Sequence, residues 1–167
     1  MLTAEEIIKI LNLKPLPREG GYFRETYRSK EIIPEDFLPS RYKTSKCFST
    51  AIYYFLTPEV FSALHRLHTD EIFHFYLGDT VTMLQLHHDG TSDVIALGQE
   101  IDKNQHTQII VPKNTWQGCF LKEGGKFALM GTTMSPGFGE SDFEAGVQKE
   151  LVKKYPDREE LILKLTT

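Results

Sequence analysis

Short runs of alternating hydrophobic and polar residues cover most of this chain, and turn-forming residues separate them. Pairs such as Gly78-Asp79, Asp89-Gly90 and Gly124-Gly125 lie between consecutive runs and favour tight turns. About nine short strands at spacings of roughly ten residues predict an all-β fold, an antiparallel sandwich or barrel. The predicted strands span residues 22–28, 47–56, 62–67, 71–77, 80–87, 92–97, 107–111, 116–121 and 127–133.

Helical patterns occur at the two ends of the chain. Near the N-terminus, Thr3 and Glu6 form a capping box ahead of an apolar stripe. Near the C-terminus, Ser141-Asp142 predicts a helix cap, and Pro156 predicts a break between two helices. The predicted helices span residues 3–13, 143–155 and 158–165.

Residues 29–46 are polar, contain two prolines and follow no period, which predicts a long loop. Loops of this length usually serve as lids, binding loops or partner contacts. The chain has 167 residues and no linker-like stretch, so we expect one domain. Its predicted parts are an N-terminal helix with linker at 1–18, a barrel at 19–140 and C-terminal helices at 141–167.

Charge and composition indicate which classes of binding partner and which cellular compartment to expect. A net charge of −4 argues against nucleic-acid binding, which needs clustered excess cations. No apolar run approaches the roughly 18 residues of a membrane span, and the N-terminus lacks the features of a signal peptide. Cys47 and Cys119 share no short spacing, which predicts two buried free thiols. We therefore expect a cytoplasmic protein that binds neither nucleic acid nor membrane.

Residues 61–78, FSALHRLHTDEIFHFYLG, concentrate the candidate chemistry. They contain three of the six histidines and an acidic pair, and they read as two strands joined by a turn at 68–70. In the second strand Glu71 shares a face with Phe73, Phe75 and Leu77, while His74 and Tyr76 lie on the other face. Histidine and carboxylate directed into a sheet cavity predict a metal site or an acid–base pair. A site using His65 would most simply pair it with Glu71.

The same stretch resembles the first motif of the cupin superfamily, in which a His-x-His pair is followed by Glu and then Gly. His65 matches the first histidine, Glu71 the glutamate and Gly78 the closing glycine. Leu67 occupies the slot of the second histidine, unless His68 reaches inward through a β-bulge.

The second cupin motif, Pro-x-Gly-x-x-His, resembles residues 112–117. Pro112 matches, and Asn114 stands in the glycine slot, where it also tolerates a left-handed turn. Gln117 occupies the slot of the histidine.

Further marks resemble one uncharacterised family of single-domain cupins, a domain of unknown function. They are Glu19-Gly20-Gly21-Tyr22-Phe23, Tyr27-Arg28-Ser29 and Ser135-Pro136-Gly137-Phe138. The resemblance implies an antiparallel double-stranded β-helix, the cupin jelly roll, like that of the deoxythymidine-diphosphate-sugar epimerases. It also implies a homodimer and a ligand pocket inside the barrel.

The matched slots leave three possibilities for the site. One divalent transition metal would be held by His65, Glu71 and Gln117, with His68, or His74, as a further ligand. In a metal-free pocket, His65 would act as general base, Glu71 would orient it, and Gln117 would hold a substrate hydroxyl or carbonyl. In a relict site the three side chains would only satisfy one another.

Five other side chains are predicted to contact a small polar ligand. An arginine on an inward face can clamp a phosphate or carboxylate, and residues 22–28 place Arg24 and Arg28 on one face. Arg28 and Arg66 can equally pair with a neighbouring acid such as Glu25 or Asp70. The predicted ligand contacts, besides Gln117, are Ser62, Arg24, Tyr54, Tyr76 and Trp116.

Three function classes follow from these alternatives. The first is an isomerase or epimerase acting on a small polar molecule, such as a sugar or sugar nucleotide, with His65 as base. The second is a metal-dependent dioxygenase or isomerase. The third is a ligand-binding or sensing module without turnover.

Overall fold

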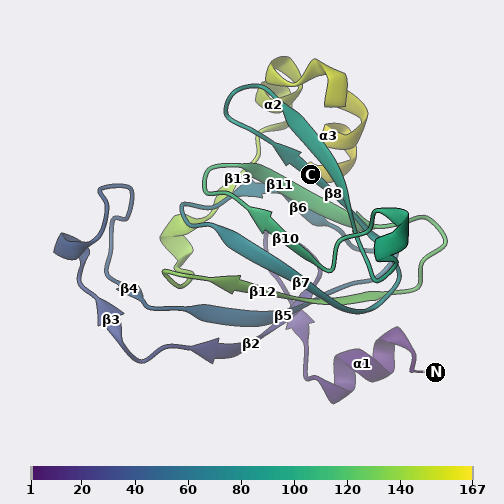
Figure 1. Cartoon of the computed structure of the whole chain (residues 1–167), viewed down its shortest axis with the longest axis horizontal. Coiled ribbons are helices and arrows are strands. Elements are labelled where there is room, and N and C mark those ends of the chain that lie inside the picture. The colour runs from purple at the N-terminus through teal and green to yellow at the C-terminus, as the bar shows by residue number, and fades with distance from the viewer. Residues whose placement is uncertain (1, 167) are drawn as a thin grey trace.

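Two antiparallel sheets pack face to face and form the barrel in the computed structural model, which describes residues 2–166 (Figure 1). The all-β jelly-roll prediction is confirmed. The six-stranded sheet has the order β1-β2-β5-β12-β7-β10, with strands Lys14–Pro15, Tyr22–Arg28, Thr50–Leu56, Ala128–Met134, Glu71–Gly78 and Gln108–Val111. The five-stranded sheet has the order β13-β6-β11-β8-β9, with strands Glu144–Ala145, Ser62–Arg66, Trp116–Leu121, Val81–Leu86 and Ser92–Leu97.

Short helices flank the barrel at both ends of the chain, as predicted. Helix α1 begins after Thr3, whose hydroxyl and backbone form the expected capping box with Glu6. The helices are α1 (Ala4–Ile10), α2 (Gln148–Lys154) and α3 (Glu159–Leu165), with 3-10 turns η1 (Glu35–Phe37), η2 (Ile101–Lys103), η3 (Glu140–Asp142) and η4 (Pro156–Arg158). None of the helices in residues 2–166 has the length and apolar character needed to cross a membrane.

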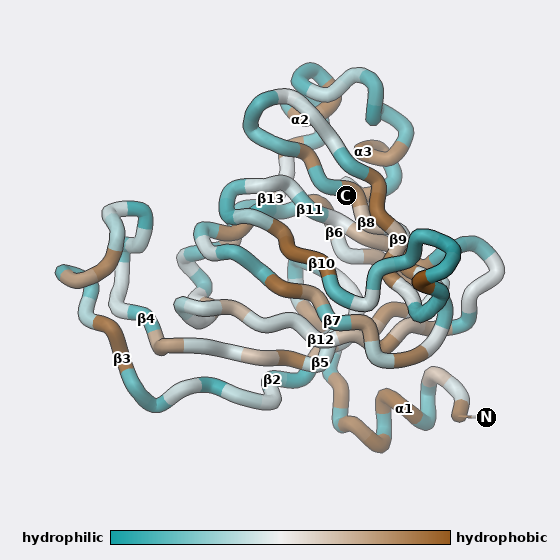
Figure 2. The backbone as a smooth tube through the Cα atoms, viewed as in Figure 1, coloured by the Kyte–Doolittle hydropathy of each residue, from teal (hydrophilic) through white to brown (hydrophobic). Residues whose placement is uncertain are grey.

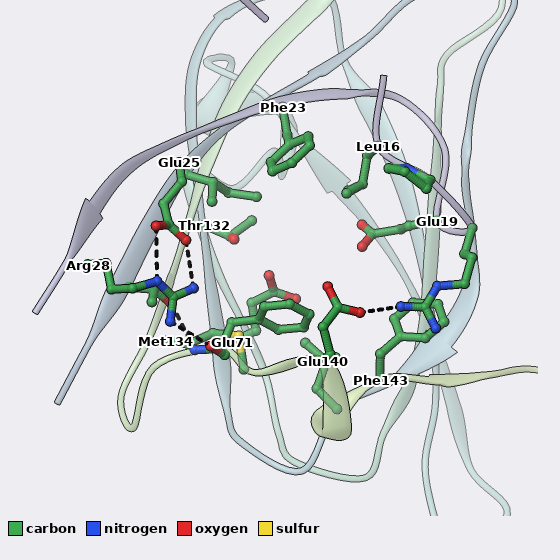
Figure 3. A pocket seen from close by; sticks show the side chains of 16 residues that line it. Leu16, Glu19, Phe23, Glu25, Arg28, Glu71, Thr132, Met134, Glu140 and Phe143 are labelled. Carbon is green, nitrogen blue, oxygen red and sulfur yellow. Dashed lines mark hydrogen bonds and ion pairs between the residues drawn. The ribbon is translucent and has the colours of Figure 1, made fainter. Parts of the chain in front are cut away.

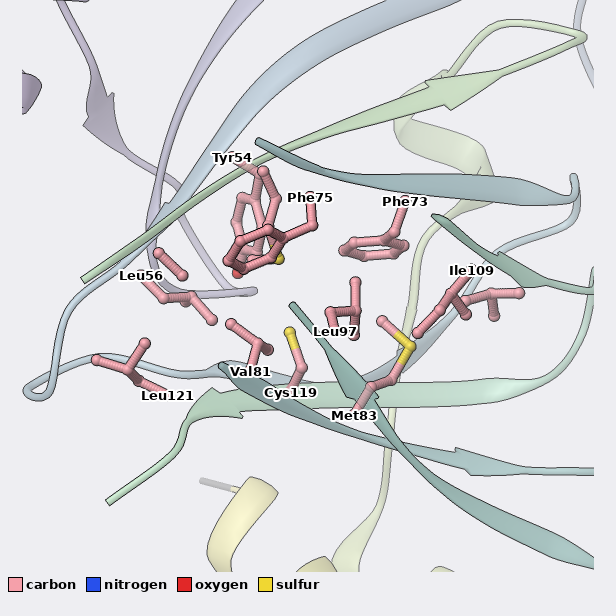
Figure 4. Packing of buried hydrophobic residues seen from close by; sticks show 13 residues of the cluster. Tyr54, Leu56, Phe73, Phe75, Val81, Met83, Leu97, Ile109, Cys119 and Leu121 are labelled. Atoms are coloured by element: carbon pink, nitrogen blue, oxygen red, sulfur yellow. The ribbon is translucent and has the colours of Figure 1, made fainter. Parts of the chain in front are cut away.

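The main hydrophobic core fills the space between the two sheets (Figure 4). Tyr54 and Phe73 from the six-stranded sheet meet Met83, Leu97 and Cys119 from the five-stranded sheet, and all five are buried. Two smaller clusters lie on the outer faces, one under α1 and one under α2 and α3. In Figure 2 β7 and β10 carry hydrophobic stretches, as does α1, while several of the connecting turns are hydrophilic. Both cysteines are buried and free, as predicted.

The segment predicted as a long loop forms an arm that projects from the barrel (Figure 1). It contains a two-stranded sheet of β3 (Ile32–Ile33) and β4 (Lys46–Cys47) with η1 between them. The predicted strand at 47–56 is therefore two strands, because β4 pairs within the arm and β5 begins at Thr50.

The helix predicted at 143–155 starts later than expected, so the prediction is wrong for its first turn. Residues Glu144–Ala145 form strand β13, which pairs with β6 at the edge of the five-stranded sheet. Gly146 then donates a backbone hydrogen bond of 2.7 Å to Leu64, so the helix starts only at Gln148. Pairing with an open sheet edge satisfies backbone groups that a helix start would leave unbonded.

Two register shifts change which side chains face inward. In β2 the pairing moves from Glu25↔Ile52 to Tyr27↔Ala51, so Glu25 and Arg28 both line the cavity between the sheets. The predicted common face for Arg24 and Arg28 is therefore wrong. In β7 a second shift pairs Leu77 with Leu129, so Leu77 leaves the face of Phe73 and is exposed. One extra residue in a strand reverses the alternation beyond it.

Candidate functional site

A cavity of about 380 Å³ opens between the sheets, beside the turn that precedes β2 (Figure 3). Its walls are largely apolar, and the charged residues on them are mainly acidic. The apolar lining consists of Leu16, Pro17, Phe23, Ile52, Leu67, Met134, Phe138 and Phe143, and the polar lining of Arg18, Glu19, Glu25, Arg28, Thr50, Glu71, Thr132 and Glu140. The volume is that of a small-molecule site.

Glu71 and Gln117 meet across the two sheets at the inner wall of this cavity. Glu71 begins β7, and Gln117 lies opposite His65 in the pairing of β11 with β6. The Gln117 amide donates a hydrogen bond of 2.6 Å to Oε2 of Glu71. Burial raises the pKa of Glu71, and the neighbouring Glu19 raises it further, although His65, Thr132 and Gln117 oppose the shift. The structure therefore brings together the predicted trio of His65, Glu71 and Gln117.

His65 lies just behind the cavity wall, with only 1% of its surface exposed. Its Nδ1 is 2.8 Å from the carbonyl oxygen of Ala63, which can only accept, so Nδ1 carries the proton and Nε2 the free lone pair. Its ring stacks on Phe143 at 5.2 Å between centroids. Burial lowers the pKa of His65, although the Ala63 hydrogen bond and the charge of Glu71 oppose the shift. A neutral imidazole with one defined basic nitrogen results.

Glu19 is the main site residue that the sequence analysis did not single out. Its Oε2 lies 3.9 Å from Nε2 of His65, and its Oε1 accepts a hydrogen bond of 3.3 Å from Ser62. The side chain is 19% exposed, and it lines the cavity. Burial raises its pKa from 4.5 to about 7, although the nearby hydroxyl groups of Ser62 and Tyr54 oppose the shift. At neutral pH Glu19 therefore populates both its protonated and its ionised form.

The turn after Glu19 aims its side chain into the cavity. Gly20 has φ of +94°, and a Cβ there would lie 2.2 Å from the carbonyl oxygen of Phe61. The Glu19 carbonyl accepts a hydrogen bond of 2.7 Å from Ala63, and the Tyr54 hydroxyl donates one of 3.0 Å to Gly20. In the sequence, the one indication of this site residue is a glutamate directly before a Gly-Gly pair and a strand. Ser62 and Tyr54, predicted as ligand contacts, support this turn and carboxylate.

Three predicted ligand contacts lie on the outer faces of the sheets. Arg24 places its guanidinium 5.3 Å from the centre of the Tyr53 ring, and Tyr53 in turn packs edge-on against Tyr76. Trp116 lies 4.5 Å beneath the guanidinium of Arg66. The structure does not bring Arg24, Tyr76 or Trp116 to this cavity.

The other candidate histidines also point elsewhere. His68 is half-buried outside the cavity lining, whereas its neighbour Leu67 does line the cavity. His74 interacts with Thr133 and Gln108. At the two motif positions where cupins have a further histidine, this chain has Leu67 and Gln117, and these two side chains are the ones that face inward.

The two arginines at the cavity are both paired with acids. Arg28 makes hydrogen bonds of 3.0 and 2.7 Å with the carboxylate of Glu25. Arg18 forms an ion pair with Glu140 and lies over the ring of Phe143 at 4.9 Å. Arg66 pairs with Glu144 on the outside of the barrel.

The donor set at the cavity does not fit a transition-metal centre. Gln117 turns its amide nitrogen toward Glu71, and Leu67 offers no donor atom. Within residues 2–166 no group of three or more His, Cys, Asp or Glu side chains is arranged to hold a metal ion. A catalytic zinc site uses three protein ligands and keeps one coordination position open, and the side chains at this cavity do not supply such a set of ligands.

Comparisons with known proteins agree with this architecture. A protein from Shewanella oneidensis of known crystal structure is 32% identical, with a TM-score of 0.87 over 100% of this chain and 99% of that one. A hypothetical protein from Leishmania major is 29% identical, with a TM-score of 0.88 and coverage of 99% of both chains. No curated protein matches this chain.

A more distant structural likeness concerns the fold alone. Oxalate decarboxylase from Bacillus subtilis is 15% identical, with a TM-score of 0.55, and the match covers 93% of this chain and 37% of that one. The family model described as Cupin superfamily (DUF985) matches residues 5–146. This chain therefore belongs to the cupin superfamily, in the family of the DUF985 domain.

Proposed function

We propose that the cavity binds a small organic molecule and catalyses proton transfer on it, as an isomerase or epimerase does. The observation that carries this proposal is the position of Glu19, which faces the cavity while its carboxylate lies 3.9 Å from Nε2 of the buried His65. A carboxyl group open to a ligand and backed by a basic nitrogen is suited to take up and return a proton.

The protonation of Glu19 supports a role as general acid and base. Its pKa of about 7 lies near neutral pH, where the transfer of a proton in either direction is most effective. In the proposed reaction the Glu19 carboxylate removes a proton from a carbon next to a carbonyl group, and the C–H electron pair enters the carbonyl to form an enolate. The proton then returns to a neighbouring atom or to the opposite face of the same carbon.

His65 acts in this proposal through Glu19, because the imidazole is almost fully buried. Its fixed Nδ1–H leaves a lone pair on Nε2, 3.9 Å from the Glu19 carboxyl group, so a neutral imidazole lies behind this group and stays uncharged. Glu71, held by Gln117, lies at the same wall and offers a second carboxyl group for the return step. His65 is thus a positioning residue, and Glu19 is the residue that meets the substrate.

Solvent deuterium incorporation tests the proposal. Candidate sugars, oxo acids and amino ketones are incubated with the protein in D₂O, and exchange next to the carbonyl is followed by NMR. We expect Glu19→Gln to reduce exchange by about 10² or more, the range of a lost general base. Glu160→Gln, on the exposed side of α3, is the control and should leave exchange unchanged. A compound that raises the melting temperature but exchanges no proton would instead indicate a binding or sensing module.

We also propose that a second copy of the chain packs against the projecting arm. The arm exposes Ile32 and Phe37, and Phe37, at 82%, is the most exposed large apolar side chain among the described residues. Wild type should sediment at about twice its 19.2 kDa mass, and Phe37→Ser should shift it toward the monomer. A 19.2 kDa species at micromolar wild-type concentration would contradict the dimer.

A further inference from the structure

The cavity carries more negative than positive groups on its wall. Four glutamates line it, at positions 19, 25, 71 and 140, against only two arginines, at positions 18 and 28. The two arginines are already engaged, Arg28 with Glu25 and Arg18 with Glu140. Once these pairs are set aside, residues 2–166 offer no further arginine or lysine at the wall as a partner for Glu19 and Glu71.

The chain supplies these two carboxyl groups with neutral donors. Gln117 donates an amide hydrogen bond to Glu71, and Ser62 donates its hydroxyl to Glu19. His65, the other nearby group, is held neutral by burial, which lowers its pKa. Two carboxyl groups thus share a low-dielectric wall on which residues 2–166 place no unpaired cation, and the charge of Glu19 raises the cost of ionising Glu71.

From this geometry we infer that the ligand of the cavity is a cation, a small molecule that presents a protonated amine or guanidinium group to Glu19 and Glu71. This inference rests on the proposed function of the same cavity and names its class of ligand. A bound cation would supply the missing countercharge, and it would hydrogen-bond to both carboxylates. The rings of Phe23 and Phe138 belong to the same cavity lining and offer the apolar contact that an organic amine also needs.

The same charge balance disfavours anionic ligands. A phosphate or nucleotide would have to displace Glu25 from Arg28 or Glu140 from Arg18, and it would approach two further carboxyl groups. Like charges brought together in a site of low dielectric repel strongly. The cavity therefore selects against a sugar nucleotide and in favour of an amine.

Protonation gives the inference a measurable signature. Cation binding requires the ionised carboxylates, and Glu19, with a pKa of about 7, ionises between pH 6 and 8. A group with that pKa is about ten times more ionised at pH 8 than at pH 6, so cation affinity should rise about tenfold. The other titratable and charged groups of the cavity wall and the residues directly behind it are Arg18, Glu25, Arg28, Tyr54, His65, Cys119 and Glu140. Burial raises the pKa of Tyr54 and that of Cys119, so both stay neutral throughout.

Three probes of one shape and different charge test the inference. Benzylamine is protonated at both pH values, benzyl alcohol is neutral, and benzoate is an anion. Dissociation constants are measured by protein NMR titration at pH 6 and pH 8, following the backbone amides of Glu71 and Thr132. We expect benzylamine to bind at least five times tighter than benzyl alcohol at pH 8, and benzoate to bind weakest.

Variants separate the role of Glu19 from that of the cavity as a whole. Glu19→Gln should reduce benzylamine affinity about tenfold at pH 8 and remove most of its pH dependence, while benzyl alcohol binds as in wild type. Glu160→Gln, far from the cavity on α3, should change nothing. Equal or tighter binding of benzyl alcohol or benzoate at pH 8 overturns the inference but keeps the cavity as a binding site. Absence of any shift with all three probes overturns both the inference and the proposed binding site.

Discussion

The amide of Gln117 donates a hydrogen bond of 2.6 Å to the carboxylate of Glu71, and this bond joins the two sheets at the wall of the cavity. Gln117 belongs to β11 of the five-stranded sheet and Glu71 to β7 of the six-stranded sheet. The residue in the slot of a cupin histidine therefore acts here as a hydrogen-bond donor to a carboxylate. It holds Glu71 in place through this hydrogen bond.

Replacing Gln117 by methionine should destabilise the protein. The change keeps the side-chain volume but leaves the buried Glu71 carboxylate without this donor, at a cost of about 1 to 3 kcal/mol. Because the donor stabilises the ionised form, its loss raises the pKa of Glu71 further, and the cost should be larger at pH 8 than at pH 5. Urea unfolding at the two pH values measures it. Gln108→Met, at an exposed amide, should cost less than about 0.5 kcal/mol.

Glu19 should make wild type less stable as pH rises. Its folded-state pKa of about 7 exceeds the ordinary 4.5, so between these values the folded state binds more protons than the unfolded state. The free energy of unfolding therefore falls from about pH 4.5 to pH 7, by an amount on the order of 2 to 3 kcal/mol. Glu19→Gln should remove this fall. Parallel curves of stability against pH for the two proteins would contradict the assignment.

The ion pair between Lys46 and Asp142 should be essential for the segment that forms one wall of the cavity. Both side chains are only 2% exposed, and Asp142 also accepts a hydrogen bond of 2.8 Å from Gly139. Lys46→Met would leave a buried carboxylate without its cation and should cost about 3 to 5 kcal/mol in chemical unfolding.

Two further variants separate this effect from a general loss of charge. The double variant Lys46→Met/Asp142→Leu should recover part of the lost stability, because no unpaired charge remains. Glu144→Gln breaks the half-exposed pair with Arg66 and should cost at most about 1 kcal/mol. Equal costs for the buried and exposed pairs would refute the distinction.

A metal site should be obtainable by restoring two histidines. Leu67 lines the cavity and Gln117 lies opposite His65, so Leu67→His with Gln117→His would add two imidazoles beside His65 and Glu71. Three histidines and a carboxylate form a set that transition metals bind. We expect the double variant to show a Co²⁺ absorption band and a Co²⁺-dependent rise in melting temperature, and wild type to show neither. A double variant that folds but ignores Co²⁺ would disprove this geometry.

Much of the barrel follows from alternation alone, because most strands have one face in the core. The strands Ser92–Leu97 and Trp116–Leu121 begin and end where the pattern predicts. The bulges in β2 and β7 were not predictable, since an extra residue is defined by the partner strand and leaves no mark in its own sequence. This is why the faces of Arg28 and Leu77 were assigned wrongly.

The site was predicted in part for a similar reason. Motif spacing brought His65, Glu71 and Gln117 to one place, because all three lie in strands and no register shift separates Glu71 from the start of its strand. Glu19 lies in a turn, and its direction depends on contacts with Phe61 and Ala63 that are distant in sequence. Periodicity carries no information about such a side chain.

The residues that line the cavity come from two kinds of segment, the strands of the sheets and the loops between them. This difference bears on how members of the family can differ in ligand. Glu71 and Thr132 are fixed by sheet ladders, whereas Glu19, Phe138 and Glu140 belong to segments that enter and leave the barrel. Exchange of those segments between relatives would alter what the cavity accepts while the barrel stays intact. Two members with superimposable barrels can thus act on different molecules, and a chimera carrying residues 135–143 of a relative should inherit part of that relative's ligand preference.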